Sequence, residues 1–215
     1  MSTDHSVASA HARAAPLVDL LRHGEPVGGQ RFRGRLDDPL SETGWAQMTA
    51  AIGEAPPWQG IITSPLRRCA DFARELAGQH DLPLHIEPRW QEINFGAWEG
   101  LTVNDLWQSV PEQIAAYWQD PTQFTPPQAE PLQALQARVI AAWQALLPSL
   151  QPGSHWLVIT HGGVIRVLLA HVLGLPLQYC LRLEIGLAQV SRIRLQTAPG
   201  TAPIGSIVFH AREHF

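Results

Sequence analysis

Two patterns that would place this chain in a specialised class are missing from it. No apolar run approaches the roughly 18 residues that span a membrane, so we expect no membrane partner. Only two cysteines occur, Cys69 and Cys180, and they match neither a metal-ligand spacing nor a disulfide framework. This usage is compatible with a reducing compartment, and we expect a cytoplasmic protein.

Positive charge is also scarce. The 15 basic residues are outnumbered by 19 acidic ones, which leaves a formal net charge of −4 at pH 7. This balance argues against nucleic acid or an anionic membrane as the main partner. If the substrate is an anion, the positive charge that binds it must be gathered locally.

The length and composition suit one α/β domain. The chain has 215 residues, 45% of them hydrophobic, which is enough for a sizeable core. Residues 1–15 are small and polar and lack the apolar segment of a secretory signal, so we expect a disordered tail there. We therefore expect a single domain over residues 16–215. The sequence leaves the oligomeric state open, a homodimer included.

Three short apolar runs end in basic residues, at 17–21, 60–63 and 155–160. Such runs are typical of buried parallel strands, and ligands of open α/β sheets bind beyond the carboxyl ends of those strands. The residues delivered to that edge are Arg22 and His23, then Arg67 and Arg68, then His161 and Gly162. We expect a three-layer α/β/α fold with a mostly parallel central sheet.

The remaining pattern predicts the other elements. Apolar spacing predicts helices over 44–52, 132–146 and 164–173, and another from Pro65 to about Ala77 with Ser64 as its N-cap. Cys69 lies on the apolar stripe of that last helix, as a core thiol. Strands are expected at 84–86, 182–195 and 204–209. Residues 101–129 hold two short helical pieces, 103–107 and 112–118, and predict a small helical cap over the sheet edge.

Three chemistries fit the predicted edge, to which the loop residue Glu92 also belongs. Arginines beside a histidine suit a phosphate group. Two histidines and a carboxylate could hold a metal ion, but no His-Glu-x-x-His run is present and the arginines would repel a cation. A serine nucleophile at Ser64 is disfavoured because Pro65 follows it and no Gly-x-Ser-x-Gly surrounds it. The loop at 26–35 is either solvated or a wall of the anion pocket, with Arg31, Arg33 and Arg35 as candidate substrate contacts.

Four sequence blocks follow one another between about Leu17 and Leu195. They are Leu-Leu-Arg-His-Gly-Glu at 20–25, Ser-Pro-Leu-x-Arg at 64–68, Glu-x-x-Phe-Gly-x-Trp-Glu-Gly at 92–100, and Thr-His-Gly at 160–162. Together they resemble the histidine phosphatase superfamily, the group similar to phosphoglycerate mutase. Arg-Phe-Arg-Gly-Arg at 31–35, Asp-Asp-Pro-Leu at 37–40, Asp-Pro at 120–121 and Phe-x-Pro-Pro at 124–127 further resemble the bacterial α-ribazole-phosphate phosphatases of cobalamin synthesis.

The resemblance implies a role for each residue. His23 would be the nucleophile that forms a phosphohistidine, and Glu92 would act as acid and then as base. Arg22 and Arg68 would clamp the phosphoryl oxygens, and His161 would add positive charge. The family's spacing selects Arg68 over Arg67. No metal or other cofactor is implied. Because His23 must be neutral while His161 helps most when protonated, we expect their pKa values to be pushed apart.

The implied activity is hydrolysis of a small phosphorylated substrate, with α-ribazole 5′-phosphate as the favoured one. A broad-specificity phosphatase, a phosphoglycerate-type mutase and an inactive phosphate-binding relative are the alternatives. Two positions depart from the family's pattern. Gly29 stands where many members have asparagine, and Ala129-Glu130-Pro131 stands in place of Gly-Glu-Ser. Neither departure touches the expected catalytic residues, but both bear on substrate preference.

Overall fold

A computed structural model describes residues 15–53, 57–196 and 203–212. In this part of the chain, six strands form one mixed sheet in the order β3-β2-β4-β1-β5-β6. Strands β1 (Leu17–Arg22), β2 (Gly60–Thr63), β3 (Leu84–Ile86) and β4 (His155–Thr160) run parallel. Strand β5 (Val190–Gln196) is antiparallel to β1, and β6 (Ile204–Arg212) is antiparallel to β5. The mostly parallel sheet is confirmed.

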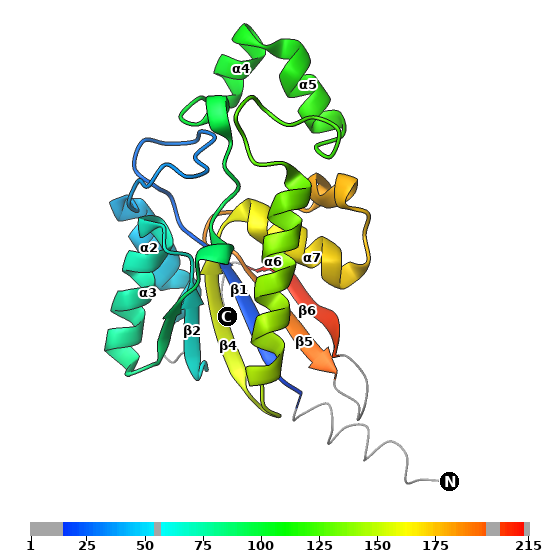
Figure 1. Cartoon of the computed structure of the whole chain (residues 1–215). Helices are drawn as coiled ribbons and strands as arrows, with labels where there is room; N and C mark the ends of the chain where they lie inside the picture. Colours follow the sequence, from blue (N-terminus) through cyan, green and yellow to red (C-terminus); the bar gives the residue numbers. More distant parts are fainter. Residues whose placement is uncertain (1–14, 54–56, 197–202, 213–215) are drawn as a thin grey trace.

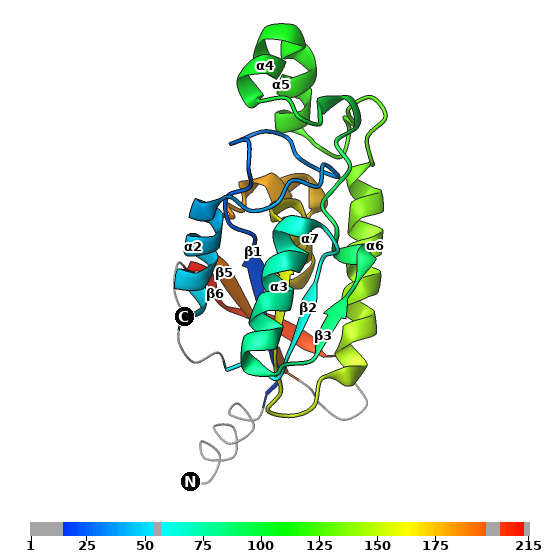
Figure 2. The same cartoon turned by 90° about the vertical axis from the view of Figure 1, so that its left-hand side faces the viewer.

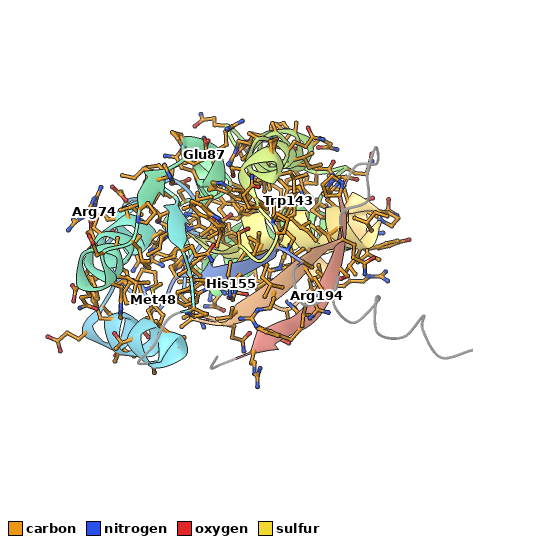
Figure 3. All side chains as sticks on the ribbon, turned by 90° about the horizontal axis from the view of Figure 1, so that it is seen from below. Met48, Arg74, Glu87, Trp143, His155 and Arg194 are labelled. Carbon is orange, nitrogen blue, oxygen red and sulfur yellow. The ribbon has the colours of Figure 1, made fainter. Side chains whose placement is uncertain are left out.

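Helices cover both faces of the sheet, which gives three layers (Figure 1). Val18 and Leu20 of β1 pack with α6 (Leu132–Leu146) and α7 (Gly162–Leu173) in one hydrophobic cluster. Leu21 packs with α2 (Glu42–Ile52) and α3 (Arg67–His80) in the other. The strands are apolar on both faces because both are covered. Figure 3 shows Met48 of α2 and Trp143 of α6 on opposite sides of the strands.

The cap is a separate helical pair beyond the carboxyl ends of the parallel strands (Figures 1 and 2). It contains α4 (Val103–Ser109) and α5 (Pro111–Gln119), within the predicted 101–129. Thr102 and Asp105 form a capping box that starts α4, and Pro111 starts α5. The cap has its own hydrophobic cluster, built from Trp98, Leu106, Ile114 and Tyr117.

Several predicted bounds differ from the structure by two or three residues, and two differences change the interpretation of a segment. The helix expected from Pro65 begins at Arg67, and its N-cap is Leu66 rather than Ser64. The Ser64 hydroxyl accepts from the amide of Leu66 at 3.3 Å, before the helix begins, and lies 2.7 Å from Nε2 of His161. The strand expected from residue 182 begins at Val190, since 177–182 form a short 3₁₀ helix and the following residues turn along the edge of the sheet. The predicted tail lies outside the described residues except for Ala15.

A buried ion cluster lies within the sheet at Asp19 of β1, which is 0% exposed. Its carboxylate accepts hydrogen bonds from Trp58 Nε1 at 2.7 Å, His155 Nε2 at 2.7 Å and the Arg192 guanidinium at 2.7 and 3.0 Å. Burial alone would raise the pKa of Asp19, but the hydrogen bonds from His155 and Arg192 outweigh it and lower the pKa.

Among the residues that the structure describes, no helix combines the length and apolar character needed to cross a membrane.

Candidate active site

Strands β1 and β4 bring the two histidines together at the edge of the sheet. The strands pair in parallel with Arg22 beside Thr160, and the His23 amide donates to the Thr160 carbonyl at 3.0 Å. A histidine directly follows each of these paired residues, so His23 and His161 lie side by side. The centroids of their rings are 5.2 Å apart. The convergence predicted from the strand ends is present.

Two glycines let the chain turn directly after His23. A Cβ at Gly24 would lie 2.3 Å from the carbonyl oxygen of Gly44, and a Cβ at Gly44 would lie 2.0 Å from that of Glu25. Only residues without a side chain allow the end of β1 and the start of α2 to approach so closely. This close crossing fixes the backbone that carries His23.

His23 has one ring nitrogen held and the other available. Nδ1 lies 2.8 Å from the carbonyl oxygen of Gly24, and because a carbonyl only accepts, Nδ1 carries the proton. In the neutral ring, Nε2 then holds a lone pair. Burial, with Arg68 and Arg22 close by, holds the pKa of His23 well below its usual value. The ring is therefore neutral at physiological pH, with a lone pair on Nε2.

His161 lies deeper, behind the surface of the site. Its ring is 0% exposed, with Nε2 2.7 Å from the Ser64 hydroxyl and 3.6 Å from Cys69 Sγ. Burial, followed by Arg68 and His23, lowers its pKa as well. Both pKa values are lowered because both rings are buried beside the same arginines, and the expected separation between them stays a prediction. Ser64 is itself 0% exposed, so it cannot meet a substrate as a nucleophile.

Two arginines flank the histidines, of which Arg68 is buried and Arg22 half-buried. Arg22 donates from Nη1 to the Ile185 carbonyl at 2.5 Å, and Arg68 donates to the carbonyls of Leu36 and Gly34 at 2.6 and 2.8 Å. Within the described residues, Nε of each arginine is buried with no hydrogen-bond partner. Burial lowers the pKa of Arg22 to about 10, so it stays charged at neutral pH. Two such donors suit an anion.

The choice of Arg68 over Arg67 is supported by its position. The Arg67 side chain is 55% exposed and pairs with Asp71 on the outer face of α3. Arg68 is 1% exposed and lines the same cavity as His23.

Glu92 faces the site from the loop after the short 3₁₀ helix Pro88–Trp90. Its two carboxylate oxygens accept hydrogen bonds from the amides of Ile93 and Gly163, each at 3.0 Å. The predicted Gly162 lines the cavity, and Gly163, which the sequence reasoning missed, holds the carboxylate. A Cβ at Gly163 would lie 2.4 Å from Glu92 Oε1, so this contact needs glycine.

The edge of the sheet opens into a cavity of about 780 Å³ beneath the cap. Arg31 and Arg33 line it, as predicted, whereas Arg35 is absent from the lining formed by the described residues. Arg35 contacts Gln91 and Glu130 on the outer side of the loop instead. Arg33 donates to Asp38, Gly29 and Val27, so it chiefly holds its own loop together. The lining also includes Phe32, Phe95, Asn104, Tyr117, Leu132, Arg166, Leu181 and Glu184.

Arg166 of α7 is the main cavity residue that sequence reasoning missed. Its Nη1 lies 3.3 Å from the position that a Cβ on Gly162 would occupy, and Arg22 Nε lies 3.4 Å from the same point. Nε donates to the Leu183 carbonyl at 2.9 Å, and no hydrogen bond from either Nη atom is recorded in the described part of the chain. The sequence did hold a signal for Arg166. It follows the predicted site residue Gly162 by four positions in one helix, and residues four apart on a helix share a face.

The side chains at this edge do not resemble a metal centre. Across residues 15–53, 57–196 and 203–212, no three histidine, cysteine, aspartate or glutamate side chains gather closely enough to hold a metal ion. The side chains nearest His23 are mostly basic, namely His161, Arg22 and Arg68, and the carboxylates of Glu25, Glu92 and Glu184 line the cavity at separate places.

Comparison with known proteins gives this arrangement a family. The sequence profile of the histidine phosphatase superfamily (branch 1) matches residues 18–202. The chain belongs to this superfamily. Its solved structures include a mycobacterial glucosyl-3-phosphoglycerate phosphatase, which superposes with a TM-score of 0.80 at 26% identity over 91% of this chain and 98% of the other.

Curated relatives of this chain carry different names. The bifunctional protein Rv2228c of Mycobacterium tuberculosis is 33% identical over 84% of this chain, which spans only 50% of that protein's length. Glucosyl-3-phosphoglycerate phosphatase of the same organism is 34% identical over 76% of this chain and 78% of its own. Adenosylcobalamin/α-ribazole phosphatase of Salmonella typhimurium is 31% identical over 73% and 79%. Relatives named as phosphatases support an enzyme of this kind.

Proposed function

We propose that the protein is a metal-independent phosphomonoesterase that works through a phosphohistidine on His23. One observation carries the proposal: His23 offers an unprotonated Nε2 in a cavity lined by two arginines whose buried Nε–H groups have no acceptor among the described residues. A phosphoryl group supplies the missing acceptors and presents phosphorus to the nitrogen.

The first half-reaction transfers the phosphoryl group to the enzyme. Nε2 of His23 attacks phosphorus and forms a P–N bond as the P–O bond to the alcohol breaks. Arg22 and Arg68 stabilise the charge on the phosphoryl oxygens, and an anion between them favours protonation of His161 nearby. Protonated Glu92 gives its proton to the departing oxygen.

The second half-reaction regenerates the enzyme. The Glu92 carboxylate takes a proton from a water molecule, whose oxygen attacks phosphorus while the P–N bond breaks. The electron pair returns to Nε2 of His23, and inorganic phosphate leaves. Neither half-reaction needs a metal ion.

The substrate that we favour is α-ribazole 5′-phosphate, which would place the enzyme in cobalamin synthesis. Similarity to the Salmonella enzyme supports this choice, as do the sequence segments at 31–40 and 120–127. A cavity of about 780 Å³ is within the size range of small-molecule sites and exceeds what a phosphate group fills. Aromatic side chains in the lining, Phe32, Phe95 and Tyr117, suit a flat ring on the alcohol.

A cytoplasmic location belongs to the same proposal. Cys69 and Cys180 are both free, buried thiols, which is compatible with a reducing compartment.

The test is steady-state release of phosphate from α-ribazole 5′-phosphate, glucosyl-3-phosphoglycerate and p-nitrophenyl phosphate, with a chelator present. A kcat/KM much higher for the first supports the full proposal. Similar, modest values on all three keep the phosphatase but reject the substrate. Isomerisation of 3-phosphoglycerate without release of phosphate would reveal a mutase, and turnover that requires an added divalent metal would overturn the mechanism.

A further inference from the structure

The loop that carries Glu92 is fastened to α6 by a single side chain, Arg138. Its Nη1 donates to the carbonyls of Arg89 at 2.8 Å and Gln91 at 2.7 Å, and its Nη2 donates to the carbonyl of Glu92 at 3.0 Å. One guanidinium therefore holds three backbone carbonyls of a four-residue stretch. The planar fork of arginine allows this, because its N–H groups point in fixed directions.

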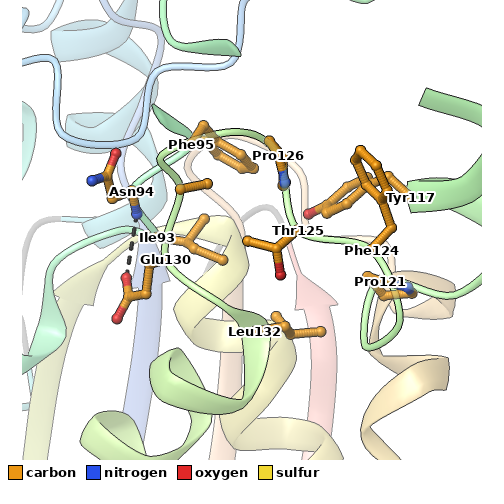
Figure 4. A pocket seen from close by; sticks show the side chains of 11 residues that line it. Ile93, Asn94, Phe95, Tyr117, Pro121, Phe124, Thr125, Pro126, Glu130 and Leu132 are labelled. Carbon is orange, nitrogen blue, oxygen red and sulfur yellow. Dashed lines mark hydrogen bonds between the residues drawn. The ribbon is translucent and has the colours of Figure 1, made fainter. Parts of the chain in front are cut away.

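Glu130 pairs with Arg138 and also hydrogen-bonds the loop on the far side of Glu92, at Asn94. Its carboxylate accepts from Arg138 Nε at 2.7 Å and Nη2 at 2.9 Å. Figure 4 shows the carboxylate beside Asn94, whose backbone N–H donates to Oε2 at 3.3 Å. The backbone N–H of Glu130 in turn donates to the backbone carbonyl of Asn94 at 2.8 Å. The backbone is thus fixed on both sides of Glu92.

This ion pair is more than a solvated surface contact. The side chains of Arg138 and Glu130 are only 18% and 15% exposed. Burial would raise the pKa of Glu130, but the hydrogen bond and charge of Arg138 outweigh it and lower the pKa. Because both partners are largely shielded from water and the Arg138 guanidinium is fully engaged, the pair defines one loop geometry rather than many.

We propose that Arg138 and Glu130 are positioning residues, which hold the Glu92 carboxylate where it can protonate the departing oxygen. Glu130 is the middle residue of Ala129-Glu130-Pro131, and it is the position of that segment that keeps the residue of the family's Gly-Glu-Ser. The inference rests on the proposed function, since it assigns Glu92 the role of general acid.

The test separates proton donation from the rest of the reaction by varying the alcohol. The burst of alcohol release at high enzyme concentration measures the first half-reaction, with p-nitrophenyl phosphate as a good leaving group and glycerol phosphate as a poor one. We expect Arg138→Gln to slow the poor leaving group by roughly 10- to 100-fold, because a small misplacement of a catalytic group costs about that much. The good leaving group, which needs little protonation, should change little.

Two further variants keep the test decisive if Arg138→Gln folds poorly. Glu130→Gln retains the size of the side chain and should give a smaller effect of the same kind. Arg74→Gln is the matched control, because Arg74 pairs with Asp71 at 2.9 Å on the solvent-exposed face of α3, and the change should leave both rates unaltered. Thermal unfolding of each variant checks that the folded protein is being measured.

A double-mutant cycle then identifies the group through which Arg138 acts. If it acts through Glu92, adding Arg138→Gln to Glu92→Gln costs little more on the poor leaving group. Equal slowing of both leaving groups by Arg138→Gln, or full additivity with Glu92→Gln, would overturn the inference. Failure of the proposed function looks different: the unmodified protein would form no phosphohistidine, or Glu92→Gln would show no dependence on the leaving group.

Discussion

Replacing Asp19 by asparagine tests the buried ion cluster in the centre of the sheet. The substitution keeps the shape of the side chain but removes a fully buried charge that accepts four hydrogen bonds. The new amide NH₂ would face donors where the carboxylate oxygen accepted. Because Asp19 lies outside the cavity lining, the expected loss is in stability and not in the chemistry of the folded protein.

The magnitude follows from the burial of the two partners. Removing one member of a buried ion pair costs about 3–5 kcal/mol. The Arg192 side chain is 21% exposed, so water can partly solvate it after the change, which favours the lower end. A loss of about 3 kcal/mol in a protein of this size lowers the midpoint of thermal unfolding by about 6–12 °C.

The pH dependence of this loss has a definite sign. The pKa of Asp19 is lower in the folded protein than in the unfolded chain, so its contribution is complete above the unfolded value of about 3.9. It disappears as pH falls below that value and through the folded pKa. The stability difference between the two proteins should therefore be constant from about pH 5 to 7 and shrink below about pH 4.

Urea unfolding of both proteins across this range is the assay, with p-nitrophenyl phosphate turnover at low temperature as the control for the site. A loss below about 1 kcal/mol at pH 7 is what an exposed ion pair would give. That result, or a difference that grew at acid pH, would refute the reasoning.

The remaining predictions concern the site. His23→Ala should abolish the phosphoenzyme, as measured by rapid quenching with ³²P-labelled substrate. Incorporation of ³²P into this variant would show that His23 is not the nucleophile. Gly163→Ala should preserve the fold but displace the Glu92 carboxylate, slowing poor leaving groups by about a hundredfold in burst kinetics; unchanged rates would show that the carboxylate tolerates the methyl group. Arg166→Gln should raise KM about tenfold with kcat nearly unchanged, because we expect the Arg166 side chain to contact the bound substrate. An unaltered KM would show that Arg166 has a structural role only. Finally, kcat/KM corrected for ionisation of the substrate should stay flat as pH falls through 6.5, because the pKa of His23 lies well below that value; an enzyme pKa at 6.5 would contradict the burial argument.

Much of the fold was predictable because periodicity reports burial directly. Leu132, Leu135, Val139, Trp143 and Leu146 repeat at helical spacing, and the observed α6 has the predicted bounds. The apolar runs that form β1, β2 and β4 are short, and each is followed by basic residues. Because the carboxyl ends of parallel strands lie at the same edge of a sheet, this pattern already predicted that the basic residues meet there.

What could not be predicted depends on contacts between residues far apart in the sequence. Ser64 has the local signature of an N-cap, but the nearby ring of His161 takes its hydroxyl. Arg31, Arg33 and Arg35 are alike in sequence, yet the loop turns the last one away from the cavity. The shared lowering of the two histidine pKa values likewise follows from burial and from the placement of Arg22 and Arg68, which no local pattern shows.

The separate hydrophobic cluster of the cap has a consequence for how the protein can change over time. Arg22, His23 and Arg68 lie on or directly after elements of the sheet and its covering helices, whereas α4 and α5 pack around Trp98 and Leu106 in a cluster that meets the main core only through Phe95 and Leu181 among the described residues. Cap positions that face the cavity, such as Asn104, can therefore be exchanged without disturbing the packing that aligns His23. Selection for a new alcohol can act on one part of the molecule while the reaction itself is inherited unchanged.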